Sequence, residues 1–324
     1  MGKTMTMPER ESGNAAAEVR GAGSAIGAPG GQADRKCEIC ASSAAEFLYR
    51  LPCYDGPYTD ATSEECRSFW KCANCGFVFT TGYDPKLYES YYSALPEDYH
   101  RLHDIDRSRY ELIRRELNGH GSLRILDYGC GNGEFLSSLP SAYEKYGVEV
   151  SERAAAEARR RGIRVLPPND LRKPELRRSF DVVVSIDVVE HVSGLSELRN
   201  HFRDSLRDGG LLLLLTGNAE GRAARKAGRY WYYHQYAEHV SFLGERSARI
   251  WLESEFQEIS FQEISHHPPT FNEKFGSLAK FPIAWTLEKA GLIHHLRRFP
   301  KLYPPCDHFL VSARRRLSNG GSTG

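Results

Sequence analysis

Short apolar runs alternate with amphipathic stretches through the middle and C-terminal parts of this 324-residue chain. Leucine and phenylalanine recur at helical spacing between residues 195 and 206, whereas the runs on either side are almost entirely apolar. The apolar runs are residues 123–127, 145–150, 163–166, 180–186, 211–215, 258–264 and 308–313. Strands that alternate with helices predict an α/β domain built on a parallel sheet.

Three glycines at alternate positions mark the end of the first strand. Gly129, Gly131 and Gly133 follow Asp127, and a helical pattern extends from Glu134 to Pro140. A strand, a tight glycine turn and a helix N-terminus form a pocket in which the backbone comes close to a ligand. The dinucleotide fingerprint G-x-G-x-x-G would need glycine at position 134. The spacing therefore predicts a ligand other than a dinucleotide.

This strand–acidic residue–G-x-G-x-G pattern resembles the class I S-adenosylmethionine-dependent methyltransferases. The resemblance continues in order from 123 to 216 and includes the D-G-G sequence at 208–210, expected as a turn before the fifth strand. It implies a Rossmann-like sheet of seven strands, the last of them antiparallel, and S-adenosylmethionine as the cofactor. Its cofactor-binding positions correspond to Asp127, Gly129, Gly131, Gly133, Glu149, Asp170 and Asp187. Glu149 would accept both ribose hydroxyls, since one carboxylate can accept two donors, and Asp170 would reach the adenine.

Two C-x-x-C pairs precede this domain. Cys37 and Cys40 form the first pair, and Cys72 and Cys75 form the second. Two such pairs about 30 residues apart are typical of a four-thiolate zinc ribbon, which we place at residues 36–82. Four protein ligands leave no open coordination position, so the zinc would be structural. Cys53 and Cys66 are alternative ligands, but neither has a C-x-x-C partner, and we expect buried thiols there.

The segment after the fifth strand is rich in aromatic residues and histidine. Its end reads Y-x-E-H-x-S-F, with Tyr236, Glu238 and His239 as candidate catalytic residues. Together with the zinc ribbon, this motif resembles the nucleotide-sugar C-methyltransferases. In that family the tyrosine and histidine are implicated in removing a proton next to a sugar ketone, work that suits a histidine near neutral pKa. The alternative is a packing element, and His234 is a second, weaker candidate base.

Two departures from that family bear on the identity of the acceptor and leave the prediction of the methyl donor unchanged. The family carries an additional C-terminal domain that we do not expect within these residues, and Ala237 replaces a frequent histidine. We therefore expect an S-adenosylmethionine-dependent methyltransferase that acts on a small molecule, such as a nucleotide-linked keto-sugar or another natural-product or polysaccharide intermediate. Whether oxygen, nitrogen or carbon is methylated does not follow from the motifs.

The remaining segments carry weaker patterns. Residues 1–35 and 317–324 are predicted to be disordered tails, because large apolar residues are almost absent there. Residues 83–118 are predicted to be a tyrosine-rich helical lid or linker, and the methyltransferase domain is predicted to extend over 119–316. An insertion at 265–305 would form a substrate cap, with an amphipathic membrane contact as the minor alternative.

Composition excludes several classes of protein. The net charge of +1 provides no basic field for nucleic acid. No apolar run approaches the roughly 20 residues of a membrane span. Without a secretory signal, a cytoplasmic location follows, where cysteines bind metals or stay reduced. Two alternatives stay open: an RNA base methyltransferase with a zinc ribbon, and a non-catalytic, methyltransferase-like interaction protein. The sequence does not specify an oligomeric state.

Overall fold

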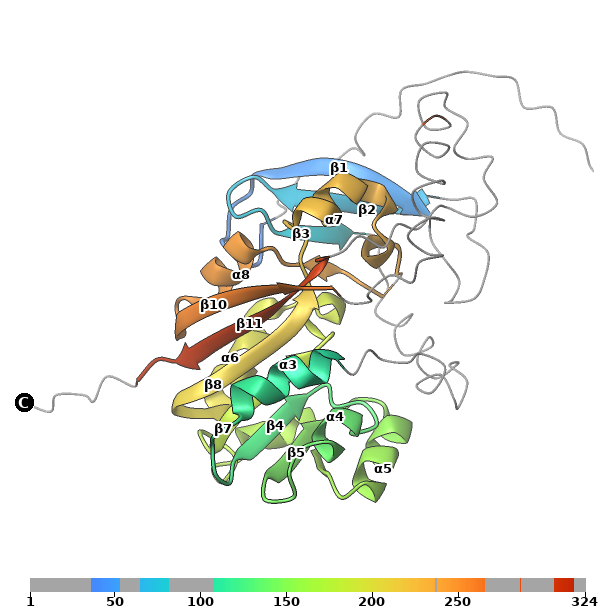
Figure 1. Ribbon diagram of the computed structural model, residues 1–324. Helices are drawn as coiled ribbons and strands as arrows, with labels where there is room; N and C mark the ends of the chain where they lie inside the picture. Colours follow the sequence, from blue (N-terminus) through green and yellow to red (C-terminus); the bar gives the residue numbers. More distant parts are fainter. Residues whose placement is uncertain are drawn as a thin grey trace, which may run out of the picture. The chain divides into compact units, whose positions relative to one another are not determined.

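A computed structural model describes residues 36–52, 65–81, 108–236, 238–265, 286 and 306–317. These residues form two sheets, one of seven strands and one of four (Figure 1). The predictions for the two tails, for residues 83–107 and for nearly all of the 265–305 insertion lie outside the described residues. The same holds for Cys53 and for the side chain of Cys66.

The seven-stranded sheet has the order β10-β11-β8-β7-β4-β5-β6. Its neighbouring strands from β6 to β8 run parallel, whereas β11 is antiparallel to both β8 and β10. The prediction of a seven-stranded methyltransferase sheet with an antiparallel last strand is therefore confirmed. The strands are β4 (Arg124–Tyr128), β5 (Glu144–Val148), β6 (Arg164–Leu166), β7 (Phe180–Ile186), β8 (Leu206–Gly217), β10 (Phe256–Ile264) and β11 (His308–Arg315).

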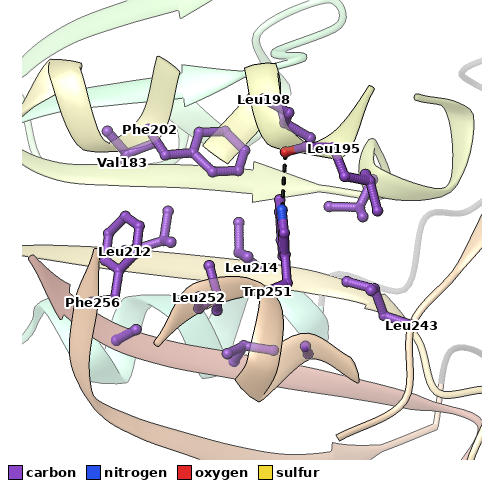
Figure 2. Packing of buried hydrophobic residues seen from close by; sticks show 14 of the residues in the cluster. Val183, Leu195, Leu198, Phe202, Leu212, Leu214, Leu243, Trp251, Leu252 and Phe256 are labelled. Carbon is purple, nitrogen blue, oxygen red and sulfur yellow. Dashed lines mark hydrogen bonds between the residues drawn. The ribbon is translucent and has the colours of Figure 1, made fainter. Parts of the chain in front are cut away.

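Helices cover both faces of this sheet. Helices α3 (Ser108–Leu117), α4 (Glu134–Ser137) and α5 (Glu152–Arg160) contribute to one apolar cluster, and α6 (Leu195–Ser205) and α8 (Glu245–Leu252) to the other. Successive leucines of β8 alternate between the two clusters, as the pleat of a strand requires. Figure 2 shows the second cluster, where the Trp251 indole N–H donates to the Leu195 carbonyl at 2.9 Å.

Two local predictions were wrong in extent. The helix after the glycine turn was expected to reach Pro140, but α4 ends at Ser137. The hydroxyls of Ser137 and Ser138 donate to the carbonyls of Glu134 and Phe135 in α4 and compete with the backbone ladder. The D-G-G sequence was expected as a turn before the fifth strand, yet it lies inside β8. There Gly209 adopts a φ of 71°, and the register with β7 shifts as in a β-bulge.

The N-terminal segment forms an antiparallel sheet that is completed from far along the chain. Strands β1 (Ala45–Pro52), β2 (Glu65–Cys72) and β3 (Val78–Thr81) pair in sequence order. The fourth strand is β9 (Ser241–Phe242), which pairs with β3. We call residues 36–81 the cysteine module. Its residues Cys37, Cys72, Cys75 and Phe77 belong to the same apolar cluster as α6 and α8.

The aromatic segment between β8 and α8 is folded into short elements. It contains α7 (Arg222–Ala227), η3 (Gly228–Tyr230), η4 (Tyr232–Gln235) and β9. Trp231, Tyr232 and Tyr233 pack in one cluster with Leu51 and Phe69 of the cysteine module. Nowhere in the described parts of the chain does a helix combine the length and the apolar character needed to cross a bilayer.

Candidate functional site

The glycine turn opens onto a cavity of about 480 Å³ at the carboxyl ends of β4, β5 and β7. Gly129, Gly131 and Gly133 all have positive φ, of 85°, 53° and 77°. A Cβ at Gly129 would lie 2.3 Å from Val188 Cγ2, and one at Gly133 would lie 3.0 Å from Ala158 Cβ. At Gly131 a Cβ would meet no atom within 4 Å. The turn is thus packed from behind at Gly129 and Gly133 and open at Gly131.

Two carboxyl groups lie beside this turn. The Glu149 carboxylate, just after β5, accepts the backbone N–H groups of Gly131 at 2.9 Å and Ser151 at 2.7 Å. Asp127 in β4 is 2% exposed, and its Oδ1 has no hydrogen-bond partner among the described residues. Burial raises the pKa of Asp127 to about 8, and the charge of Glu149 adds to the shift. The cavity therefore presents polar oxygens and one open glycine, which fits a ligand rich in hydroxyl and amino groups.

An ion pair lies at the end of β7. The Arg109 guanidinium, in the first turn of α3, donates to Asp187 Oδ2 at 2.6 Å, and both residues line the cavity. Asp187 has a φ of 51°, uncommon for a residue other than glycine, and this backbone directs its carboxylate to the cavity wall. A buried guanidinium at a cavity is suited to bind a carboxylate.

The three candidate catalytic residues lie together on the cavity wall. Tyr236, Glu238 and His239 all line it, and although they lie about 100 residues after the glycine turn in the sequence, they line the same cavity as that turn. His239 is 5% exposed, and its Nδ1 lies 2.9 Å from the Tyr233 carbonyl oxygen. A carbonyl only accepts, so Nδ1 carries the proton and Nε2 is left as an acceptor. Burial, with the neighbouring His191, holds the pKa of His239 well below its usual value.

A second layer of titratable groups surrounds His239. The rings of His191, in η2 (Val189–His191), and His239 are 4.7 Å apart between centroids. One carboxylate oxygen of Glu190 and one ring nitrogen each of His191 and His239 lie within 4.8 Å of one another. Glu190 accepts a hydrogen bond from the Thr216 hydroxyl at 2.8 Å, and burial raises its pKa to about 8. Burial lowers the pKa of His191 to about 4. Neutral imidazoles thus prevail here at neutral pH.

Tyr233 links the end of β8 to His239. Its hydroxyl accepts the Gly217 backbone N–H at 3.1 Å, and its carbonyl accepts from His239. A Cβ at Gly217 would lie 2.3 Å from Cε1 of the Tyr233 ring, so this close approach requires glycine. The end of β8 therefore fixes the tyrosine that orients His239.

Two predicted residues lie elsewhere. Asp170, in η1 (Pro168–Arg172), is not among the cavity residues, and its carboxylate pairs with Lys173 at 2.8 Å. Its contact with adenine stays a prediction. His234 is buried against Phe69, Trp231 and Phe242, where its Nδ1 hydrogen-bonds the Tyr49 hydroxyl of the cysteine module. His234 also does not line the cavity.

Sequence reasoning missed Arg109 and Tyr233. Arg109 shares a helical face with Ile113 and Leu117, which are four and eight residues further on and are both buried. The position of Arg109, a charged residue on the apolar face of this helix, was therefore the sequence signal that could have identified it as a candidate site residue. Tyr233 had no such signal, because it is one of four tyrosines between residues 230 and 236.

The four cysteines of the C-x-x-C pairs form a separate cluster. Sγ atoms of Cys37 and Cys75 are 3.5 Å apart, and those of Cys40 and Cys72 are 3.6 Å apart. All four sulfurs lie within 4.8 Å of one another. Sulfurs around a tetrahedral zinc, with bonds of about 2.3 Å, lie roughly 3.8 Å apart. The spacing of these thiols fits that geometry.

Comparison with known proteins identifies the domain. The family described as "Methyltransferase domain" matches residues 90–257, just over half of the chain. A ubiquinone biosynthesis O-methyltransferase of Rickettsia canadensis is 26% identical over 138 residues, 39% of this chain and 58% of the relative. That of Rhizobium etli is 33% identical over 124 residues, 35% of this chain and 47% of the relative. The chain spans about half the length of these curated relatives.

Solved structures match this chain at low sequence identity. The YcgJ protein of Bacillus subtilis is 14% identical with a TM-score of 0.48, and the match covers 66% of this chain and 100% of that one. An S-adenosylmethionine-dependent methyltransferase of Archaeoglobus fulgidus is 18% identical with a TM-score of 0.43, covering 64% and 93%.

Proposed function

Since this chain belongs to the methyltransferase domain family, we propose that it is an S-adenosylmethionine-dependent methyltransferase whose acceptor is a small molecule deprotonated by His239. One observation carries the proposal. The glycine turn, Glu149 and the Tyr236–His239 segment surround a single cavity of about 480 Å³. Donor and acceptor would thus meet in one enclosed space, where positioning contributes much of the rate enhancement.

We assign the part of the cavity beside the glycine turn to the cofactor. S-adenosylmethionine, when bound, supplies a methyl group activated by a sulfonium. We assign its adenosine to the open face of the glycine turn and to Glu149, whose carboxylate would exchange backbone N–H donors for ribose hydroxyls. Asp127 and Asp187 would face its positively charged methionine part, and Arg109, now paired with Asp187, is our candidate for its carboxylate.

The acceptor half is lined by Tyr236, Glu238 and His239. The acceptor must lose a proton if a carbon or a hydroxyl is to be methylated. A neutral imidazole whose Nδ1 is bonded to the Tyr233 carbonyl has its Nε2 ready to take that proton. A carbon next to the ketone of a nucleotide-linked sugar, or an acidic hydroxyl, therefore suits this base. The curated relatives are named as O-methyltransferases, which supports a small-molecule acceptor.

A structural zinc ion is proposed for the cysteine module. Cys37, Cys40, Cys72 and Cys75 supply four thiolates at spacings that fit tetrahedral coordination. Three of these cysteines are buried in the apolar cluster shared with α6 and α8, so the ion would stabilise the module where it packs on the larger domain.

Filling the open face of the glycine turn tests the cofactor site. We expect Gly131→Leu to weaken S-adenosylmethionine binding by at least about tenfold, or ~1.4 kcal/mol, measured by titration calorimetry. Gly162→Leu is the matched control, since Gly162 also has positive φ, of 82°, with nothing within 4 Å of its Cβ. Both variants place a side chain at a positive φ, of 53° at position 131 and 82° at position 162, but of the two glycines Gly131 alone lines the cavity. Equal affinity in the two variants would contradict the site.

The raised pKa of Asp127 predicts proton release on cofactor binding. With a pKa of about 8, Asp127 is mostly protonated at pH 7 in the free enzyme. A positively charged ligand favours its carboxylate, so up to one proton leaves when S-adenosylmethionine binds. Calorimetry at pH 7 in buffers of different ionisation enthalpy measures this release, which should fall in Asp127→Asn. Undiminished release in that variant would assign the proton to another group.

The acceptor is tested by mass spectrometry. Enzyme and S-adenosylmethionine are incubated with nucleotide-linked keto-sugars and with phenolic acceptors, and products are examined for one added methyl group. Methylation of either class supports the proposal. Cofactor binding without methylation in any reaction, including one with RNA, would favour the non-catalytic alternative. Methylation of RNA alone would overturn the small-molecule acceptor.

A further inference from the structure

The segment that carries His239 lies between the cysteine module and the cavity. On one side, Phe79 and Val78 of β3 pair with Ser241 and Phe242 of β9, and the Thr80 N–H donates to the Val240 carbonyl at 3.0 Å. On the other side, the Val240 N–H donates to the Glu190 carbonyl at 2.7 Å. Residue 240 is therefore bonded to both the module and the cavity wall.

One side chain of the module reaches the backbone of the catalytic residues themselves. Arg67, in β2, is 2% exposed. Its Nη1 donates to the Tyr236 carbonyl at 2.7 Å, and its Nη2 donates to the His239 carbonyl. The two carbonyls are those at the ends of the 236–239 turn. A planar guanidinium holds two acceptors at a fixed spacing, which an ammonium cannot do.

We propose that Arg67 is a positioning residue for methyl transfer. By fixing both ends of the 236–239 turn, it holds the His239 imidazole toward the cavity with Nδ1 on the Tyr233 carbonyl. Through this contact the cysteine module takes part in catalysis without lining the cavity. The inference rests on the proposed function, because it takes His239 as the proton acceptor.

The electrostatics of the turn agree with this arrangement. His239 is surrounded by Glu190 and His191 of η2, Tyr233 and Tyr236 of its own segment, His308 of β11 and Arg67 of β2. Burial is the main cause of its lowered pKa, and the positive charge of Arg67 contributes in the same direction. Arg67 therefore sets the position of the imidazole and also favours its neutral form.

Two substitutions separate these effects. Arg67→Gln removes both the charge and the pair of donors, whereas Arg67→Lys keeps the charge and loses the paired geometry. Nitrogen-15 NMR of the histidines reports the tautomer and the pKa of His239 without any acceptor. In Arg67→Gln we expect a mixed tautomer and a pKa closer to the usual value. In Arg67→Lys we expect a mixed tautomer with a smaller change in pKa.

Turnover is measured with a nucleotide-linked keto-sugar as the acceptor. A misplaced base costs about 10²-fold in rate, so we expect kcat to fall by about that factor in Arg67→Gln and by less in Arg67→Lys. The Kd for S-adenosylmethionine should stay unchanged in both. Arg229→Gln is the control: Arg229, in η3, donates to the Arg50 carbonyl of β1 across the same interface and is not among the residues that line the cavity.

The outcomes distinguish this inference from the proposed function. Folded Arg67 variants with the wild-type His239 tautomer, pKa and kcat overturn the inference and leave the proposed function intact. A wild-type enzyme that methylates no small molecule overturns the proposed function, while the NMR comparison still decides whether Arg67 positions His239. If Arg67→Gln does not fold, Arg67→Lys carries the test, and an unchanged tautomer there overturns the inference.

Discussion

We expect the replacement of His239 with glutamine to lower kcat by about 10² to 10⁴-fold and to leave the affinity for S-adenosylmethionine unchanged. General base catalysis contributes rate factors of that size, and glutamine keeps a polar side chain without a proton acceptor of suitable pKa. The measurement is turnover of the methylated acceptor together with calorimetric titration of the cofactor. Loss of kcat with intact cofactor binding assigns His239 to the acceptor half of the cavity.

His234→Gln is the matched control for that experiment. His234 has the same 5% exposure as His239 but does not line the cavity. We expect it to lower the free energy of unfolding, because it breaks the bond to Tyr49, and to leave kcat of the folded enzyme unchanged. Equal effects of the two substitutions on kcat would contradict a specific role for His239.

The pH dependence follows from the lowered pKa of His239. The base is active when neutral, so activity should persist as pH falls through 6.5 and decline only when the imidazolium forms at lower pH. The acidic limb of kcat against pH measures this value. A limb centred at the ordinary histidine pKa would mean that another histidine, or a solvated one, takes the proton.

Removing the proposed zinc from the cysteine module should abolish the order of strands β1, β2 and β3 and lower kcat as well. Structural zinc contributes about 10–16 kcal/mol to the folding of isolated zinc-finger peptides, far more than the packing of a three-stranded sheet of this size can replace. The loss of β3 and Arg67 would release the 236–242 segment. We expect chelation or Cys72→Ser to lower kcat strongly and to change S-adenosylmethionine affinity little.

Cys306→Ser is the control for the cysteine substitution. Cys306 is exposed and lies outside the four-thiol cluster. It should therefore keep the metal content, determined by elemental analysis, and the wild-type kcat. Hydrogen exchange over residues 65–81 then reports the order of the module directly. Full activity in protein without bound metal would contradict the proposed role of the cluster.

The cavity's cofactor half was largely predictable, because its signals are local. A glycine turn, the acid after the next strand and the apolar strands each depend on a few consecutive residues. Asp127, Glu149 and Asp187 accordingly line the predicted cavity. Loop geometry depends less on a few consecutive residues. Asp170 lies on a 3₁₀ turn and pairs with Lys173, and nothing in the sequence indicated that its carboxylate would form this ion pair.

The contacts that join the cysteine module to the domain were not predictable. Strand β9 contains two residues, and its partners in β3 lie about 160 positions earlier. Neither propensity nor periodicity indicates such a pairing in a two-residue strand. Arg67 precedes three buried residues in a strand without polar–apolar alternation, so its burial left no periodic signal. Arg109, by contrast, was detectable from the helical stripe it shares with Ile113.

Strand β9 has a consequence for synthesis on the ribosome. The cysteine module is translated first, but its sheet and the cover over Phe69 require residue 242. Domains commonly fold as they emerge, N-terminal part first. Here β3 remains an open edge and apolar side chains of β2 remain uncovered until most of the methyltransferase domain has been made. The nascent chain therefore carries an unpaired strand edge, which is able to pair with other chains, throughout that interval.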